Sequence, residues 1–130
     1  MANIAINGFG RIGRLFLRAL TESNDAKTLK VKIINDLADI ESNIHLFKYD
    51  SIHGKFNNKI KKTKNSFDLG NGPIEVVSVS NPSEYPWGKK NIDIVFECTG
   101  ILTSKKDCLN HINAGAKRVI VSAPSDDSDI

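Results

Sequence analysis

The chain has 130 residues, of which 40% are hydrophobic and 25% charged, the composition of an ordinary globular domain. One domain of this length buries roughly two thirds of its unfolded surface, so it needs no disulfide framework. The formal net charge of +3 is too small to indicate a nucleic-acid-binding protein. No apolar run reaches the roughly 18 residues of a membrane helix and no signal peptide is evident, so we expect a cytoplasmic location.

Residues 1–6 predict a short buried strand, and a glycine-rich turn follows it. Gly8, Gly10 and Gly13 have the G-x-G-x-x-G spacing. In a dinucleotide-binding turn such glycines allow a tight bend, a close approach of the backbone to a pyrophosphate, and close packing of helix on strand. A helix is expected next, with its N-terminal N–H groups and positive dipole end facing an anionic diphosphate. Its predicted apolar stripe consists of Ile12, Leu15, Phe16, Ala19 and Leu20.

The second strand is predicted at residues 31–35, and Asp36 lies at its C-terminal end. Asp36 comes 36 − 13 = 23 positions after Gly13, close to the roughly 20 expected for an acid that binds the adenosine ribose. The alternative is that Asp36 caps the next helix, predicted from Asp39 to Lys48. The glycine pattern favours the ribose. The apolar face of that helix is formed by Ile40, Ile44 and Phe47.

Residues 55–79 predict an antiparallel hairpin insertion, because two partly polar strands flank a turn at Gly70–Pro73. A buried strand at residues 92–96 follows, and then a third helix from about Ser104 to near Gly115. A further buried strand is predicted at residues 119–121. The inward residues predicted for the third helix are Cys108, Leu109 and Ile112.

Strands alternating with helices, with continuous apolar runs in the strands, predict an α/β fold with a doubly wound parallel sheet. Ligands of such sheets bind outside the carboxyl ends of the strands. The glycine turn, Asp36, Thr99-Gly100 and Ser122 all follow strands. The alternatives are a plain strand-to-helix turn at Thr99-Gly100 and a turn hydroxyl at Ser122.

Four segments carry a resemblance to a known family. They are Asn7–Arg14 (NGFGRIGR), Lys48–Phe56 (KYDSIHGKF), Glu97–Gly100 (ECTG) and Ala116–Pro124 (AKRVIVSAP). Taken together, these segments make the chain resemble phosphorylating, NAD-dependent glyceraldehyde-3-phosphate dehydrogenase over essentially all of its residues. The resemblance implies a Rossmann-type NAD-binding domain at residues 1–130, cut before the sixth strand and without the catalytic domain.

The resemblance also implies a role for each cofactor-binding position. The backbone N–H groups of Arg11 and Ile12 would bind the pyrophosphate, Asp36 the adenosine ribose, and Ser122 would lie near the nicotinamide ribose. An acid at Asp36 beside Leu37 favours NAD over NADP, because a 2′-phosphate would be repelled and would find no cation. The implied cofactor-binding set is Gly8, Gly10, Arg11, Ile12, Gly13, Asp36, Thr99, Gly100 and Ser122.

By resemblance, the whole enzyme would convert glyceraldehyde 3-phosphate to 1,3-bisphosphoglycerate in glycolysis while NAD is reduced. The nucleophilic cysteine of the family lies in a Ser-x-x-x-Cys-Thr-Thr motif that these 130 residues do not contain. We therefore expect no catalytic residue and no metal site, a chain inactive alone, and a homo-oligomer, since such relatives are commonly tetramers. Sugar phosphate would bind only with the catalytic domain.

The remaining cysteines and histidines receive structural interpretations. We expect Cys98 and Cys108 in the core, His45 and His111 on helix surfaces, and His53 in a structural role or at a subunit contact. Two alternatives to the main hypothesis stay open: a stand-alone, non-catalytic dinucleotide-binding module, and a fragment of erythrose-4-phosphate dehydrogenase. Asp36 weighs against the latter, in which Glu is expected.

Overall fold

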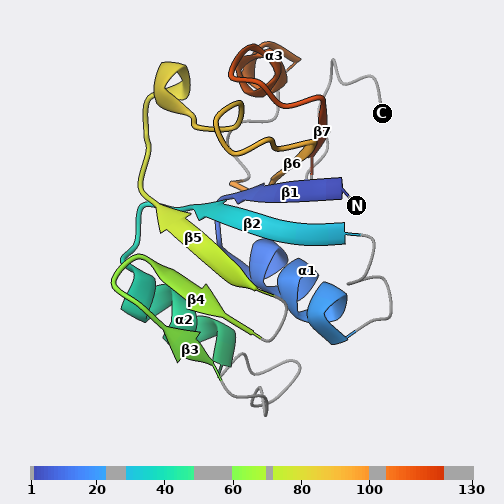
Figure 1. Ribbon diagram of the computed structural model, residues 1–130. Coiled ribbons are helices and arrows are strands. Elements are labelled where there is room, and N and C mark those ends of the chain that lie inside the picture. Colours follow the sequence, from blue (N-terminus) through green and yellow to red (C-terminus); the bar gives the residue numbers. More distant parts are fainter. Residues whose placement is uncertain (1, 23–28, 49–59, 70–71, 100–104, 122–130) are drawn as a thin grey trace.

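The computed structural model describes residues 2–22, 29–48, 60–69, 72–99 and 105–121. They form one sheet with helices on both faces (Figure 1). The strands are β1 (Ala2–Asn7), β2 (Leu29–Asn35), β3 (Lys61–Lys62), β4 (Ser66–Asp68), β5 (Pro73–Val77), β6 (Ile94–Glu97) and β7 (Arg118–Val121). The helices are α1 (Arg11–Glu22), α2 (Ile40–Lys48), the short 3₁₀ helix η2 (Pro82–Glu84) and α3 (Lys105–Asn113).

The strand order is β3-β4-β5-β2-β1-β6-β7. β5, β2, β1, β6 and β7 run parallel, whereas β3 and β4 pair antiparallel with their neighbours. The predicted doubly wound sheet and its antiparallel hairpin are confirmed. β5 has two roles, because it closes the hairpin with β4 and also pairs parallel with β2 (Ile33↔Glu75). The parallel strands therefore end along one edge.

Helix α1 packs on the sheet with a face that is rotated from the predicted one. Leu17 and Leu20 are buried, while Ile12 is 48% exposed and Ala19 is exposed. Gly13 explains the rotation: a Cβ there would lie 2.7 Å from the carbonyl oxygen of Gly8. Because Gly13 packs against Gly8 and Ile6, the buried or partly buried stripe runs through residues 13, 16, 17 and 20. Of the predicted stripe, Phe16 and Leu20 are confirmed, whereas the inward positions predicted for Ile12 and Ala19 are wrong.

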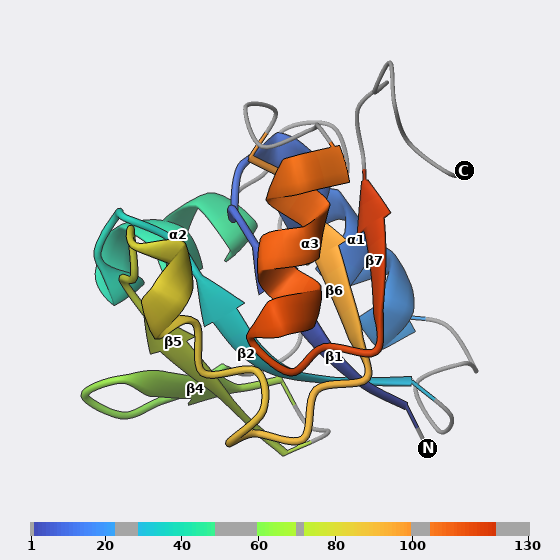
Figure 2. The ribbon, with the colours of Figure 1, turned by 90° about the horizontal axis from the view of Figure 1, so that it is seen from above.

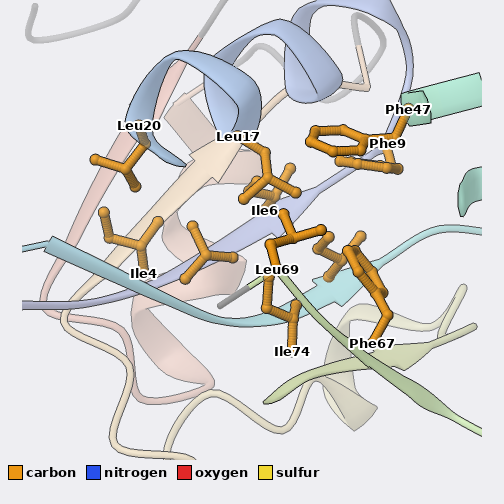
Figure 3. Packing of buried hydrophobic residues seen from close by; sticks show 11 residues of the cluster. Ile4, Ile6, Phe9, Leu17, Leu20, Phe47, Phe67, Leu69 and Ile74 are labelled. Atoms are coloured by element: carbon orange, nitrogen blue, oxygen red, sulfur yellow. The ribbon is translucent and has the colours of Figure 1, made fainter. Parts of the chain in front are cut away.

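The larger core lies between the sheet and helices α1 and α2 (Figure 3). Ile4 and Ile6 of β1 point into it, whereas Ala5 faces the other side, as expected for a strand buried on both faces. Phe9, from the turn after β1, stacks on Phe47 of α2 with ring centroids 6.2 Å apart. The face predicted for α2 is thus confirmed, and its packing holds the glycine turn against the core.

The second core lies on the opposite face, under α3 and the segment that precedes β6 (Figure 2). Trp87 belongs to this core and is fully buried. The predicted inward face of α3 is wrong, because Leu109 is 47% and Ile112 38% exposed, whereas His111 is completely buried. His111 lies inside because its two ring nitrogens have polar partners there, Trp87 and Glu97. Leu109 and Ile112 consequently turn outward.

Candidate functional site

A cleft of about 510 Å³ opens at the edge where the parallel strands end. Its walls come from the turn after β1, the end of β2, the segment after β5 and the end of β6. Of the residues singled out from the sequence, the structure brings Gly8, Gly10, Asp36 and Thr99 together here. The lining residues are Asn7, Gly8, Gly10, Asn35, Asp36, Leu37, Val79, Ser80, Tyr85, Cys98 and Thr99.

The three glycines of the turn do different things. Gly8 has φ +92°, and a Cβ on it would lie 2.8 Å from the backbone nitrogen of Thr99. Gly13 lets α1 approach the turn, as described above. Around Gly10 no atom lies within 4 Å of where a Cβ would be, so this backbone faces the open cleft. Two glycines therefore serve packing and one leaves open space at the cleft, where the approach of a pyrophosphate stays a prediction.

Two N–H groups of the turn are already used inside the protein. Gly8 N–H donates to the carbonyl oxygen of Asn35 at 2.7 Å, and Phe9 N–H donates to Oδ1 of Asp36 at 2.8 Å. These bonds tie the turn after β1 to the end of β2. They also mean that neither group is available to a ligand in this arrangement.

The N–H groups of the first turn of α1 differ from those of Gly8 and Phe9 in their hydrogen bonding. α1 begins at Arg11, and the N–H of Arg14 donates to the carbonyl oxygen of Gly10 at 2.9 Å. The N–H groups of Arg11, Ile12 and Gly13 therefore precede the first intrahelical hydrogen bond and have no acceptor within the helix. Together with the helix dipole, they make this terminus suited to an anion. That a diphosphate binds at this terminus stays a prediction.

Asp36 is held at the rim by its neighbours. Its Oδ2 accepts a hydrogen bond from Ala38 N–H at 3.0 Å, in addition to the bond from the glycine turn. α2 is capped by another residue, Asp39, whose Oδ1 accepts Ser42 N–H at 2.7 Å. The capping alternative for Asp36 is thus excluded by the structure. Leu37, next to it, is 73% exposed.

Glu97 is a polar residue of the site that the sequence interpretation missed. It is 1% exposed and accepts four hydrogen bonds. Oε1 accepts from Asn7 Nδ2 at 2.7 Å and from His111 Nε2 at 2.6 Å; Oε2 accepts from the N–H and hydroxyl of Thr99 at 2.9 and 2.6 Å. Burial raises the pKa of Glu97, but these hydrogen bonds outweigh burial and hold the pKa below its ordinary value. Glu97 is a carboxylate at neutral pH.

His111 bridges Glu97 and the second core. Trp87 Nε1–H donates to Nδ1 of His111 at 3.0 Å. The indole can only donate, so Nδ1 must be an unprotonated acceptor, and the ring proton lies on Nε2, facing Glu97. His111 is therefore neutral in this arrangement, and the prediction of a helix-surface position is wrong. His45 is exposed on α2, as predicted.

Asn35 extends the same set of hydrogen bonds across the sheet. Its side chain accepts Val79 N–H at 2.7 Å and donates to the Val79 carbonyl oxygen at 2.9 Å. It also donates to Oδ1 of Asn7 at 2.7 Å. The cleft walls after β5, β2, β1 and β6 are thus connected by buried side chains. No local sequence pattern marks Asn7, Asn35 or Glu97 as partners, because each is simply the last residue of an ordinary apolar strand.

Other predicted residues are placed less fully. Gly100, Ser122 and His53 lie outside the described residues. Cys98 packs against the larger core and also lines the cleft, and Cys108 is partly buried. Over the described parts of the chain, no three His, Cys, Asp or Glu side chains gather in a metal-binding arrangement. Among those same residues, none of the helices has the length and hydropathy to cross a bilayer.

Comparison with known proteins agrees with this geometry. The family described as glyceraldehyde 3-phosphate dehydrogenase, NAD binding domain, matches residues 2–105. Glyceraldehyde-3-phosphate dehydrogenase of Xanthobacter flavus is 50% identical over 127 residues, covering 98% of this chain and 38% of the relative. The enzymes of Cereibacter sphaeroides and Clostridium acetobutylicum are 48% and 47% identical, over 97% and 96% of the chain and 37% and 36% of their own lengths.

The chain thus spans somewhat more than a third of the length of these curated relatives. The match falls on the part that forms the NAD-binding domain, and it contains the glycine turn, Asp36 and Thr99. Sequence, fold and cleft agree on the same assignment. The chain belongs to the glyceraldehyde-3-phosphate dehydrogenase family, and its fold is that of the family's NAD-binding domain.

Proposed function

We propose that residues 1–130 form the domain that holds NAD in an oxidoreductase of glyceraldehyde 3-phosphate. The observation that carries this proposal is the distribution of donors at the turn. The N–H groups of Gly8 and Phe9 donate to residues at the end of β2. Those of Arg11 and Ile12 have no acceptor within α1 and can donate to an anion at its start. The diphosphate would lie there, with Gly10 giving it room.

We propose positions for the two ends of the cofactor from the residues that line the cleft. The adenosine ribose would bind at Asp36, and the nicotinamide half would extend toward Thr99, with Gly100 and Ser122 completing the set expected by resemblance. NAD is favoured over NADP, because the Asp36 carboxylate would repel a 2′-phosphate and the exposed neighbour Leu37 offers no compensating charge.

We further propose that these residues bind and orient the cofactor while other residues perform the aldehyde chemistry. NAD, when bound, accepts the hydride. Neither Cys98, at the cleft wall, nor Cys108, on α3, lies in the family's Ser-x-x-x-Cys-Thr-Thr motif. The 130-residue polypeptide should therefore bind NAD but not oxidise glyceraldehyde 3-phosphate in the presence of phosphate. The complete reaction to 1,3-bisphosphoglycerate would require residues beyond this set.

Calorimetric titration of the polypeptide with NAD and NADP tests the binding site. NAD should bind with measurable heat and NADP at least about tenfold more weakly, equivalent to about 1.4 kcal/mol. Asp36→Asn should reduce this preference. Absence of NAD binding, or equal affinity for both cofactors, would contradict the proposed site. Spectrophotometric assay of nicotinamide reduction, with glyceraldehyde 3-phosphate and erythrose 4-phosphate in parallel, tests the expected lack of activity.

Cytoplasmic location and homo-oligomeric assembly are also part of the proposal. The homo-oligomer follows from the family resemblance, whereas the location rests on the sequence argument given above. Sedimentation velocity of the protein at several concentrations measures the assembly directly. A single monomeric species at all concentrations would contradict a homo-oligomer for this polypeptide.

A further inference from the structure

The buried hydrogen bonds at the cleft share one direction. Asn35 donates to Asn7, and Asn7 donates to Glu97. From the other side, Trp87 donates to His111, and His111 donates to Glu97. Because a carboxylate only accepts, Glu97 is the final acceptor of both sequences of bonds and determines which way each amide and ring between them is oriented.

Thr99 shows what this means for the cleft. Both of its donors, the backbone N–H and the hydroxyl proton, are directed to Oε2 of Glu97. In this arrangement its hydroxyl oxygen can only accept a hydrogen bond from a ligand. Such an oxygen suits a ribose hydroxyl or an amide N–H and does not suit a phosphate oxygen. The diphosphate is thereby directed to the start of α1 and a neutral part of the cofactor to Thr99.

We propose that Glu97 is a positioning residue for the cofactor and that neutral His111, on α3, acts as the donor and acceptor bridge that keeps the Glu97 carboxylate in place. This inference rests on the proposed NAD site. It adds that residues behind the cleft wall, His111 and Trp87 on the far side of Glu97, influence cofactor affinity through Thr99.

The neutral state of His111 separates this proposal from an ordinary buried ion pair. An imidazolium would place an N–H on Nδ1 against the indole N–H of Trp87. A glutamine can replace the neutral ring, because its amide N–H can donate to Glu97 while its carbonyl oxygen accepts from Trp87. A leucine of similar size can do neither and leaves a buried carboxylate with one donor fewer.

The test compares His111→Gln with His111→Leu, and uses His45→Gln and His45→Leu on the exposed face of α2 as matched controls. Binding of NAD is measured by calorimetry on variants first shown to be folded by circular dichroism. His111→Leu should weaken NAD binding by about fivefold or more, the lower end of typical coupling between sites. His111→Gln should stay within about twofold of the unmodified protein, and both His45 variants should equal it.

Two further measurements keep the proposal independent of folding and of the proposed function. Side-chain ¹⁵N spectra at neutral pH should show His111 protonated on Nε2 alone. The milder pair Thr99→Ser and Thr99→Val should retain and lose affinity, respectively, since only serine keeps the hydroxyl. If the unmodified protein binds no NAD, the proposed function fails. If it binds NAD and His111→Leu binds equally well, or His111 is an imidazolium, the positioning role fails while the NAD site stands.

Discussion

Replacing Gly10 by alanine should weaken NAD binding and leave the fold intact, whereas the same change at Gly13 or Gly8 should destabilise the fold. A Cβ at position 10 meets no atom within 4 Å. Alanine is a poorer N-cap than glycine, which lowers the free energy of unfolding by about 0.5–1 kcal/mol. It also makes the unfolded chain less flexible, which raises the free energy of unfolding by about 0.4–1 kcal/mol. The free energy of unfolding should therefore change by less than about 0.5 kcal/mol.

The other two glycines give larger effects. At Gly13 a Cβ would lie 2.7 Å from the carbonyl oxygen of Gly8. Overpacking of about 1–3 kcal/mol exceeds the roughly 1 kcal/mol that alanine gains in a helix, so Gly13→Ala should be net destabilising. At Gly8 the φ of +92° costs a further 1–2 kcal/mol or so, and the Cβ would press on the backbone of Thr99. Gly8→Ala should destabilise most.

Two assays on the same three variants separate these roles. Urea unfolding followed by the fluorescence of Trp87, the single tryptophan, measures stability. Calorimetric titration with NAD measures affinity. Gly10→Ala should bind NAD about tenfold or more weakly, about 1.4 kcal/mol, because its methyl group occupies the approach of the diphosphate. Full affinity in Gly10→Ala, or a loss of stability matching that of Gly13→Ala, would refute the division of roles among the glycines.

Three other changes test the remaining parts of the site. The hydrogen bonds of Glu97 outweigh burial and lower its pKa from the ordinary value of 4.5. The ionised side chain therefore contributes its full stabilisation above pH 4.5, and this contribution is lost as the pH falls through the lower pKa of the folded state. Urea unfolding at several pH values should show that the free energy of unfolding depends less on pH in Glu97→Gln, and an unchanged pH dependence would contradict the assignment. Asp36→Asn should lower affinity for NAD more than for NADP in parallel titrations, and equal losses would argue against a ribose contact. Trp87→Phe removes the donor to His111 and should reduce the free energy of unfolding by about 1–3 kcal/mol; denaturant unfolding measures it by circular dichroism, and retention of full stability would show that the indole hydrogen bond contributes little.

Much of the site could be predicted from the sequence because its signals are local. The glycine spacing, the strand before it and the helix after it lie within the first 22 residues, and Asp36 is recognised by its distance from Gly13 and its place at the end of a strand. Each of these depends on backbone preferences and periodicity over short stretches. The order of strands and helices, and hence the doubly wound sheet, follows from the same information.

Tertiary structure decided the features that depend on residues far apart in the chain. Asn7 and Glu97 are 90 positions apart, and neither is marked as buried or paired by its neighbours. Part of the predicted α1 face and the predicted α3 face are wrong for the same reason: close packing at Gly13 rotates one helix, and the polar partners of His111 draw that residue inward on the other. Hydrophobic periodicity records how apolar residues are spaced, but the burial of a polar side chain depends on whether the folded chain supplies hydrogen-bond partners for it.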